Sequence, residues 1–135
     1  MSLFSALAIG ASGMAAQRTR AELLTENLAN AETTRTPDGG PYRRKDVVFE
    51  SQSFSSMLDS AGVSVSEIVT DQRDPEKRYL PGHPDAGPDG YVAFPRINPA
   101  EEMVNLMSAS RGYEANVASI SVAKDMIQRS IDLLR

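Results

Sequence analysis

Apolar residues near the amino terminus recur at alternating spacings of four and three residues. From Leu3 to Ala31 this stepping meets apolar side chains at seven of nine positions, and the exceptions are Gly10 and Gln17. The large members of the stripe are Leu3, Leu7, Met14, Leu24 and Leu28. A stripe with a period of about 3.5 residues is typical of a coiled-coil seam. The pattern predicts that the first segment of the chain, residues 1–33, forms one long helix.

The same stepping through the last segment, residues 98–135, meets apolar side chains at eight of ten positions. Its large members are Met103, Leu106, Tyr113, Val117, Ile120, Ile127, Ile131 and Leu134. Asn98 is a favourable N-cap, and Pro99 suits the first helical position. This segment is predicted to form a second, longer helix that runs beside the first as a coiled-coil-like pair.

The middle segment, residues 34–97, is rich in proline, glycine and serine, and it holds every proline except Pro99. Apolar and polar residues alternate at 63–66 and continue through Val69, which predicts a strand. Residues 91–94 predict a second strand that Pro95 ends, and the turn signals between the two strands predict an irregular excursion. The expected fold class is therefore α+β, mainly α, with a small β-containing segment between the terminal helices.

Both predicted helices carry apolar residues outside the main stripe. These are Phe4, Ile9 and Leu23 in the first helix, and Val104, Met107, Val122, Met126 and Leu133 in the second. A helix that is apolar on more than one side needs more than one neighbour. In a short chain other subunits are the natural source of such neighbours. An ordinary two- or three-helix domain with a long loop explains the same periodicity and stays open as an alternative.

Small residues dominate the start of the first helix. Between Ala6 and Ala16, eight of eleven positions are alanine, glycine or serine. Gly10 and Gly13 would each weaken an isolated helix by about 1 kcal/mol relative to alanine. Small residues also let helix backbones approach closely. The segment is therefore expected to be a poor helix alone and a good one when it is tightly surrounded.

Composition excludes several classes of function. The chain has 135 residues, no cysteine, a single histidine and a net charge of −4. A mildly acidic chain has no electrostatic drive toward nucleic acid, and no phosphate-binding loop or dinucleotide fingerprint occurs. The histidine, His83, lies in a Pro-Gly-His-Pro sequence and is expected to be a turn residue. We expect no catalytic residue, no metal site, no cofactor and no small-molecule substrate.

The first sixteen residues carry no charged side chain, and the first basic residue is Arg18. A secretory signal peptide begins with a basic region. The stretch is also too short and too rich in small residues to span a bilayer. If the protein leaves the cytoplasm, we expect a route that does not read a cleavable signal of this type.

Two motifs stand at opposite ends of the chain. The first contains Asn27, Asn30 and Thr33, and the second contains Arg111, Tyr113 and Asn116. In this order they resemble the terminal signatures of the flagellar axial proteins, the family of rod, hook and hook-associated subunits. Residues 34–36, 40–45 and 79–86 narrow the resemblance to the short proximal rod members. Leu80 departs from that pattern, which has an acidic residue there.

The resemblance implies a structural subunit of the bacterial flagellar basal body, not an enzyme. Such subunits join other rod proteins and copies of themselves in the rod, a tubular drive shaft that crosses the periplasm and transmits motor torque for motility. The resemblance also implies delivery by the flagellar type III export apparatus without a cleaved signal peptide. A soluble coiled-coil adaptor or secretion chaperone is the alternative function.

Two groups of polar residues leave their roles open. Arg43, Arg44 and Lys45 form a basic run in an acidic chain, and we expect them to pair with acidic surface on a neighbouring subunit or to be solvated. Asn27 and Asn30 lie near the end of the first helix. Their amides are suited either to capping that helix or to bonding a neighbouring one, and the alternative is that Asn30 simply ends the helix.

Overall fold

The computed structural model describes residues 3–55 and 60–133 of the chain. Within these residues the elements in chain order are α1 (Leu3–Ala29), β1 (Lys45–Ser55), β2 (Ser60–Thr70), β3 (Glu76–Tyr79), β4 (Tyr91–Phe94) and α2 (Pro99–Asp132). The predicted fold class is confirmed, because two long terminal helices flank a smaller β-containing segment. The N-cap is also as predicted: the Asn98 side chain accepts a hydrogen bond from the backbone N–H of Ala100 at 3.1 Å.

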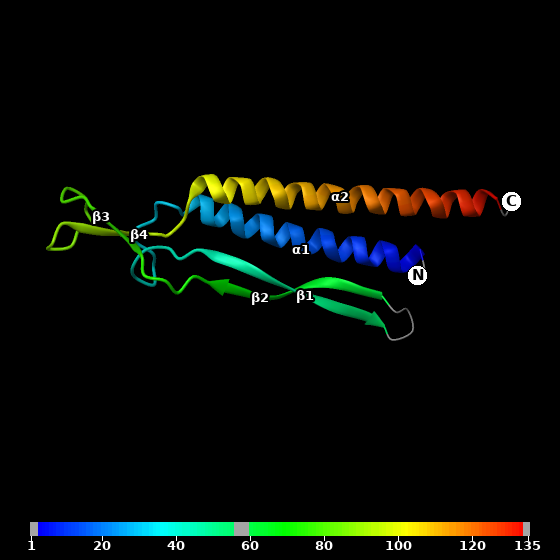
Figure 1. The fold of residues 1–135 in the computed structure, drawn as a ribbon, viewed down its shortest axis with the longest axis horizontal. Coiled ribbons are helices and arrows are strands. Elements are labelled where there is room, and N and C mark those ends of the chain that lie inside the picture. Colours follow the sequence, from blue (N-terminus) through cyan, green and yellow to red (C-terminus); the bar gives the residue numbers. More distant parts are fainter. Residues whose placement is uncertain (1–2, 56–59, 134–135) are drawn as a thin grey trace.

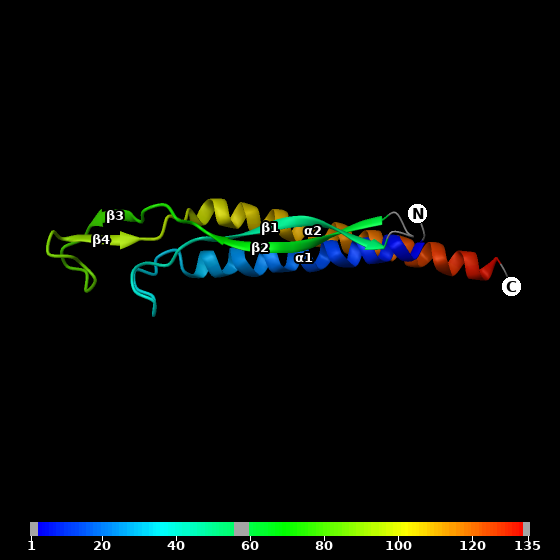
Figure 2. The same ribbon diagram turned by 90° about the horizontal axis from the view of Figure 1, so that it is seen from below.

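The molecule is elongated and layered around α1 (Figure 1). The helices α1 and α2 run side by side in opposite directions, and the antiparallel hairpin β1–β2 lies along the other side of α1 (Figure 2). Among the described residues, α1 packs on both α2 and the hairpin, whereas α2 and the hairpin do not meet. The second hairpin, β3–β4, projects beyond the end where α1 stops and α2 begins.

Small residues let α1 and α2 approach closely. A Cβ added at Gly10 would lie 2.8 Å from Cγ1 of Ile120, and one at Gly13 would lie 2.8 Å from Oδ1 of Asn116. A Cβ at Gly112 would lie 3.1 Å from Cδ of Gln17. Gly10 and Gln17, the two exceptions in the predicted stripe, therefore lie at the contact between the helices.

The hairpin β1–β2 corrects the sequence-based interpretation. The predicted strand at 63–69 lies within β2, but β1 was not predicted. Its sequence mixes polar and apolar residues without clean alternation, and its register shifts at a bulge between Val48 and Phe49. Pairing with β2 defines this strand, from Lys45 opposite Thr70 to Ser55 opposite Ser60. The side-chain hydroxyl of Ser12 also anchors the hairpin to α1, because it accepts a hydrogen bond from the N–H of Val63 at 3.1 Å.

The strand β3 is a second correction, since it lies in residues predicted to be irregular. All four of its residues are exposed, so no burial pattern marks it in the sequence. It forms by pairing with β4, the strand predicted at 91–94, and Tyr79 packs edge-on against Tyr91 with ring centroids 5.3 Å apart. Asp85, in the turn between these strands, accepts a hydrogen bond from Thr34 at 2.8 Å and pairs with Arg35. The turn is therefore tied back to the start of the middle segment.

The close helix contact predicts a specific sensitivity at Gly13. A leucine there must displace the Asn116 side chain or separate the helices, so Gly13→Leu is expected to lower the free energy of unfolding by about 2 kcal/mol. Ala11→Leu is the matched control, because Ala11 is exposed on the same helix. Thermal unfolding followed by far-UV circular dichroism measures both. Equal stabilities of the two variants would contradict the close approach.

Candidate functional site

The outer surface of α2 carries large apolar side chains that nothing in the described chain covers. What we call the outer surface of α2 is the set of its apolar side chains, with that of the C-cap Leu133, that are 44–88% exposed. They are Met103, Val104, Met107, Val117, Val122, Met126, Ile131 and Leu133. By contrast, the buried residues of α2 are Glu102, Ala109 and Ala123. The helix therefore turns its small residues toward α1 and its large ones outward.

This arrangement divides the apolar stripe predicted for α2. Leu106, Ile120 and Ile127 are half-buried, whereas Met103, Tyr113, Val117 and Ile131 are exposed. A second series of positions, spaced seven residues apart, lies against α1: Glu102, Ala109, Asn116 and Ala123. The half-buried residues between them, such as Leu106 and Ile120, belong both to this series and to the predicted stripe. This series faces α1 because its members either are small, as Ala109 and Ala123 are, or lie opposite a small residue of α1, as Asn116 lies opposite Gly13. Leu134 lies outside the described residues.

The stripe predicted for α1 is placed more uniformly. Leu24 is buried, and Leu7, Met14 and Leu28 are half-buried. The side chain of Leu3 lies outside the described part of the structure. The stripe of α1 is thus mostly covered within the chain, so the uncovered apolar area lies chiefly on α2.

A buried polar junction joins the other ends of the helices to the hairpin. We call it the Asn27 junction, and its residues are Asn27, Tyr42, Arg44, Lys45 and Glu102. The Asn27 side chain is fully buried. Its Oδ1 accepts hydrogen bonds from the Tyr42 hydroxyl at 3.1 Å and from the Lys45 N–H at 2.9 Å. Its Nδ2 donates to the Lys45 carbonyl at 2.8 Å and to Oε2 of Glu102 at 3.0 Å.

Asn27 therefore bonds both backbone groups of Lys45, as a neighbouring strand would. This contact fixes the first residue of β1 against α1, while the bond to Glu102 holds the first turn of α2. The other carboxylate oxygen of Glu102 accepts a hydrogen bond from Nε of Arg44 at 2.6 Å. Three segments far apart in the sequence thus share one satisfied polar cluster, which is the condition for burying such groups without a large penalty.

Two pKa values are shifted at the junction by burial and by neighbouring charges. Burial is the main reason that the pKa of Tyr42 rises to about 12, and the negative charges of Glu26 and Glu102 add to it. Burial acts to lower the pKa of Arg44, but hydrogen bonds to Glu102 and Asp46 outweigh it, so the pKa rises. Both groups are therefore held in their protonated forms.

The structure separates the roles of the two asparagines that the sequence left open. Asn27 bonds the neighbouring helix through Glu102, whereas Asn30 caps its own helix by donating to the Glu26 carbonyl at 2.9 Å. The Thr33 hydroxyl donates to Oδ1 of Asn30 at 3.1 Å, which continues the cap. The first motif thus builds the end of α1.

The second motif lies along α2. Nδ2 of Asn116 donates to the Gly112 carbonyl at 2.9 Å, and the same side chain fills the space above Gly13. Tyr113 is 40% exposed, and Arg111 is exposed without an ion pair among the described residues. The asparagine of this motif thus takes part in the helix contact.

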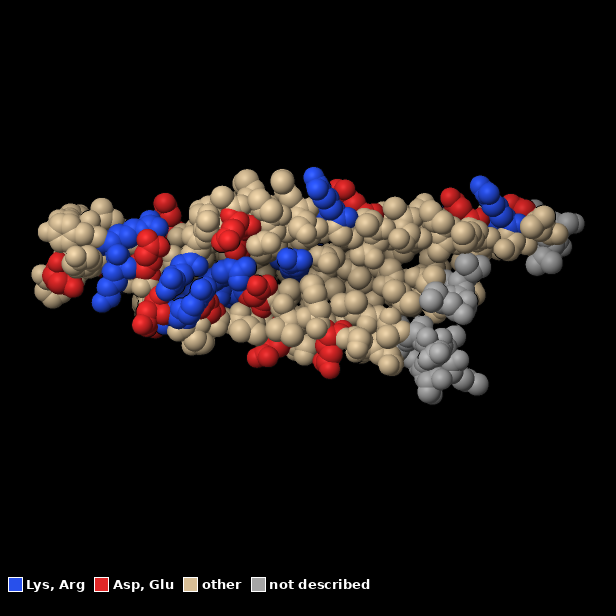
Figure 3. Space-filling model, viewed as in Figure 1, with Lys and Arg blue, Asp and Glu red and all other residues tan. Residues whose placement is uncertain are grey.

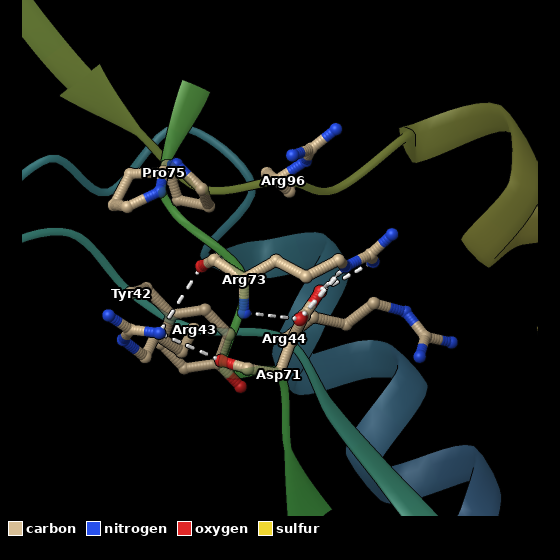
Figure 4. A pocket seen from close by; sticks show the side chains of 8 residues that line it. Tyr42, Arg43, Arg44, Asp71, Arg73, Pro75 and Arg96 are labelled. Carbon is tan, nitrogen blue, oxygen red and sulfur yellow. Dashed lines mark hydrogen bonds and ion pairs between the residues drawn. The ribbon is translucent and has the colours of Figure 1, made fainter. Parts of the chain in front are cut away.

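The basic run makes its contacts within the chain. Arg44 pairs with Glu102 and Asp46, and Lys45 pairs with Glu26 at 2.6 Å. Arg43 instead donates to the backbone carbonyls of Asp71 and Arg73 at 3.0 and 3.3 Å (Figure 4). The expectation that these residues pair between subunits stays a prediction.

Sequence reasoning missed the residues that surround the basic run. Arg73 and Arg96 come from distant segments and line the same hollow as Arg43 and Arg44, next to Asp71 (Figure 4). Hydrogen bonds from the side chain and backbone of Arg73 lower the pKa of Asp71 to about 2. No spacing in the sequence brings these residues together, because the pairing of β1 with β2 and of β3 with β4 does so.

The single histidine, His83, has a structural role in a turn. Nδ1 of His83 accepts a hydrogen bond from the Asp85 N–H at 3.1 Å, as befits a turn residue. Within the described residues, no group of three or more histidine and acidic side chains is arranged to hold a metal ion. Neither described helix combines the length and apolar character needed to cross a membrane.

Comparison with known proteins places these features in a family. Residues 89–133 match the model of the flagellar basal body rod FlgEFG protein C-terminal family. The flagellar basal-body rod protein FlgC of Borreliella burgdorferi is 38% identical over an alignment 151 positions long, which covers 100% of this chain and 99% of the relative. FlgC of Bacillus subtilis is 40% identical, with coverage of 98% and 99%, and FlgC of Salmonella typhimurium is 38% identical, with coverage of 98% of each chain.

The Asn27 junction predicts a large effect of one substitution. Asn27→Leu keeps the size of the side chain but leaves buried groups of Lys45, Tyr42 and Glu102 without partners. We expect a loss of about 3 kcal/mol in the free energy of unfolding. Asn30→Ala, which removes a part-buried bond within α1, is the control and should cost about 1 kcal/mol. Urea unfolding of the purified variants compares them, and similar losses would contradict a special role for Asn27.

The raised pKa of Tyr42 predicts an alkaline transition. A tyrosine whose pKa is higher in the folded than in the unfolded chain stabilises the fold fully below its ordinary pKa. That contribution is lost as the pH rises from 10.0 to about 12. Stability measured across this window should therefore fall more steeply for the native chain than for Tyr42→Phe. Parallel curves for the two proteins would rule out Tyr42 as the cause.

Proposed function

This chain belongs to the family of FlgC flagellar basal-body rod proteins, and from that premise we propose that it builds the rod by packing its two terminal helices against those of neighbouring subunits. Its role is structural: it is a subunit of the basal-body rod, not an enzyme. The proposal concerns which surfaces make the assembly and how they carry load.

The observation that carries the proposal is the outer surface of α2. In a chain that functions alone, large apolar side chains are normally turned inward, yet here Ala109 and Ala123 are inside while Met103, Met107 and Met126 are each more than half exposed. Burying one such side chain contributes about 1.5–3 kcal/mol. Contact with helices of other subunits would recover this free energy along the length of α2.

The ends of the helices support the same conclusion. Gly10 lies opposite Ile120 and Gly13 opposite Asn116, so the start of α1 reaches only the level of residues near 126. Beyond that level no other described element lies beside α2, which continues to Asp132 (Figure 1), and Ile131 and Leu133 are 51% and 88% exposed. A neighbouring subunit that covers this overhang would link successive subunits along the rod.

We further propose that the chain is part of the proximal rod, where it helps the drive shaft transmit torque across the periplasm. Torque would pass through helix contacts between subunits, while the β1–β2 hairpin braces the outer side of α1. A satisfied polar cluster such as the Asn27 junction suits this task, because its bonds resist sliding of the helices relative to the hairpin. Its partners would be copies of itself and other rod subunits.

Delivery to the rod is proposed to occur through the flagellar type III export apparatus without cleavage of a signal peptide. In support, the uncharged residues 3–16 belong to α1, which packs on α2 and the hairpin. Removal of this segment would expose the partner surfaces of both elements. Gly10 and Gly13, which each weaken an isolated helix by about 1 kcal/mol relative to alanine, also suit passage in an unfolded form.

A soluble coiled-coil adaptor or secretion chaperone is the alternative function. Such a protein would cover its apolar surface in a closed dimer of fixed size. The names of the full-length relatives favour the rod instead. Sizing the purified chain separates the two, because a rod subunit should give monomers or open-ended assemblies, and a single stable dimer would favour the adaptor.

The overhang of α2 provides the test of assembly. Ile131→Asp places a charge where a neighbour should desolvate it, so the variant should be absent from purified basal bodies and its cells should not swim. Gln128→Asp, an exposed polar position one turn earlier, should swim normally. Circular dichroism should show both isolated chains folded as the native one. Normal motility with Ile131→Asp, or global unfolding of that variant alone, would refute the proposed surface.

A further inference from the structure

Two arginines near the root of the β1–β2 hairpin, Arg43 and Arg96, form no salt bridge among the described residues, although Asp71 lies near Arg96. Arg43 is held by carbonyl oxygens, which accept from only one of its nitrogens. Arg96 is exposed, follows the buried Pro95, and makes no ion pair in the part of the chain that the structure describes. Arg44 and Arg73, which line the same hollow, are already paired with carboxylates.

Arg43 is also positioned in advance for a further contact. A guanidinium group offers five N–H donors, and the carbonyl bonds fix its place while leaving most donors free. Figure 3 shows lysine and arginine side chains gathered over this end of the molecule, near the start of the hairpin. Here Arg43, Arg44, Arg73 and Arg96 surround the single carboxylate of Asp71 in one hollow. We call this hollow the arginine collar.

The hairpin itself carries the opposite charge. Its described strands contain Asp46, Glu50 and Glu67, and their only basic residue is Lys45, which pairs with Glu26. Asp46 pairs with Arg44, but Glu50 and Glu67 are exposed and make no ion pair within the described residues. Acidic side chains are visible along this edge of the molecule in Figure 3.

Glu50 and Glu67 also lie close together on the ribbon. Glu67 is opposite Val48, and Glu50 is two residues further along the same strand. Like charges on adjacent strands repel each other, so a cation between them would stabilise the hairpin. Around them Val48, Ile68 and Val69 are each 43–48% exposed. Exposed apolar residues with unpaired charges at their edge are typical of an interface.

From this complementarity we propose that the arginine collar of one copy binds Glu50 and Glu67 on the hairpin of a second copy. The proposal rests on the proposed function as a rod subunit and names one of its lateral contacts. Arg43 and Arg96 would donate to the two carboxylates, and the exposed valines of the hairpin would pack beside them. The contact uses different surfaces on the two copies.

The geometry of such a contact fits a rod. An interface between two different surfaces of the same chain does not close on itself unless a ring forms, and it otherwise generates an open helical assembly. Along the extended chain, Val48, which lies opposite Glu67, is five residues after Arg43, and Glu50 is seven residues after it. At about 3.3 Å per residue, the neighbouring copy would be displaced by about 20 Å along the long axis.

Charge reversal tests the contact. Cells in which Arg96→Glu or Glu67→Arg replaces the native chain should contain at least about tenfold less of it in purified basal bodies, because like charges would then face each other. The double variant, Arg96→Glu with Glu67→Arg, restores opposite charges between copies and should return the amount to within about twofold of the native level. Lys77→Glu is the matched control, since Lys77 is an exposed cation on β3 that makes no ion pair within the described residues.

The amounts of these variants in purified basal bodies decide whether the arginine collar binds the hairpin of a second copy. Normal incorporation of both single variants would overturn the contact, and so would an equal loss with Lys77→Glu. Loss in the single variants without recovery in the double variant would show that the collar meets a different subunit, which also overturns the proposal. Circular dichroism of each purified variant excludes unfolding as the cause. If the native chain itself were absent from basal bodies, the rod function would fail instead.

Discussion

The buried amide of Asn27 makes four hydrogen bonds, and the arrangement of the whole chain depends on them. They join the end of α1 to the first residue of β1 and to the first turn of α2. Because an unpaired amide or carboxylate at this depth would cost several kcal/mol, the three segments have one favourable arrangement. The direction of the hairpin and the alignment of the helices both follow from this point.

From the junction outward, small residues determine how the helices pack. Gly10 and Gly13 leave no space between α1 and the side chains of Ile120 and Asn116. The contact buries Ala109 and Ala123 of α2 and half-buries Leu106, Ile120 and Ile127, while the methionines and several valines of α2 lie outside it. This arrangement suits a structural subunit, since one side of α2 packs on α1 and the other side is free to pack on neighbouring subunits.

Several features could be predicted from the sequence because they depend on local patterns. The stripe from Leu3 to Ala31, the Asn98 cap and the alternation in β2 each reflect a repeat or a capping preference. The strand β1 and the arginine collar could not be predicted. Residues of β1 show no regular alternation, and the collar gathers arginines from three segments that are distant in sequence. Such features arise from pairing between strands, which no single segment encodes.

The sequence by itself determined the two terminal helices, the β-containing middle and, through the motifs at each end, the resemblance to flagellar axial proteins. Only the tertiary structure decided which side of α2 faces α1. The predicted stripe and the series that contains Ala109 and Ala123 include the same half-buried residues, so the sequence pattern fits either side. The short distance between the helices selects the side with the alanines. The tertiary structure also decided that Asn27 bonds a neighbouring helix while Asn30 caps its own. Both amides have the same chemistry, and they differ only in what the folded chain brings within hydrogen-bonding distance.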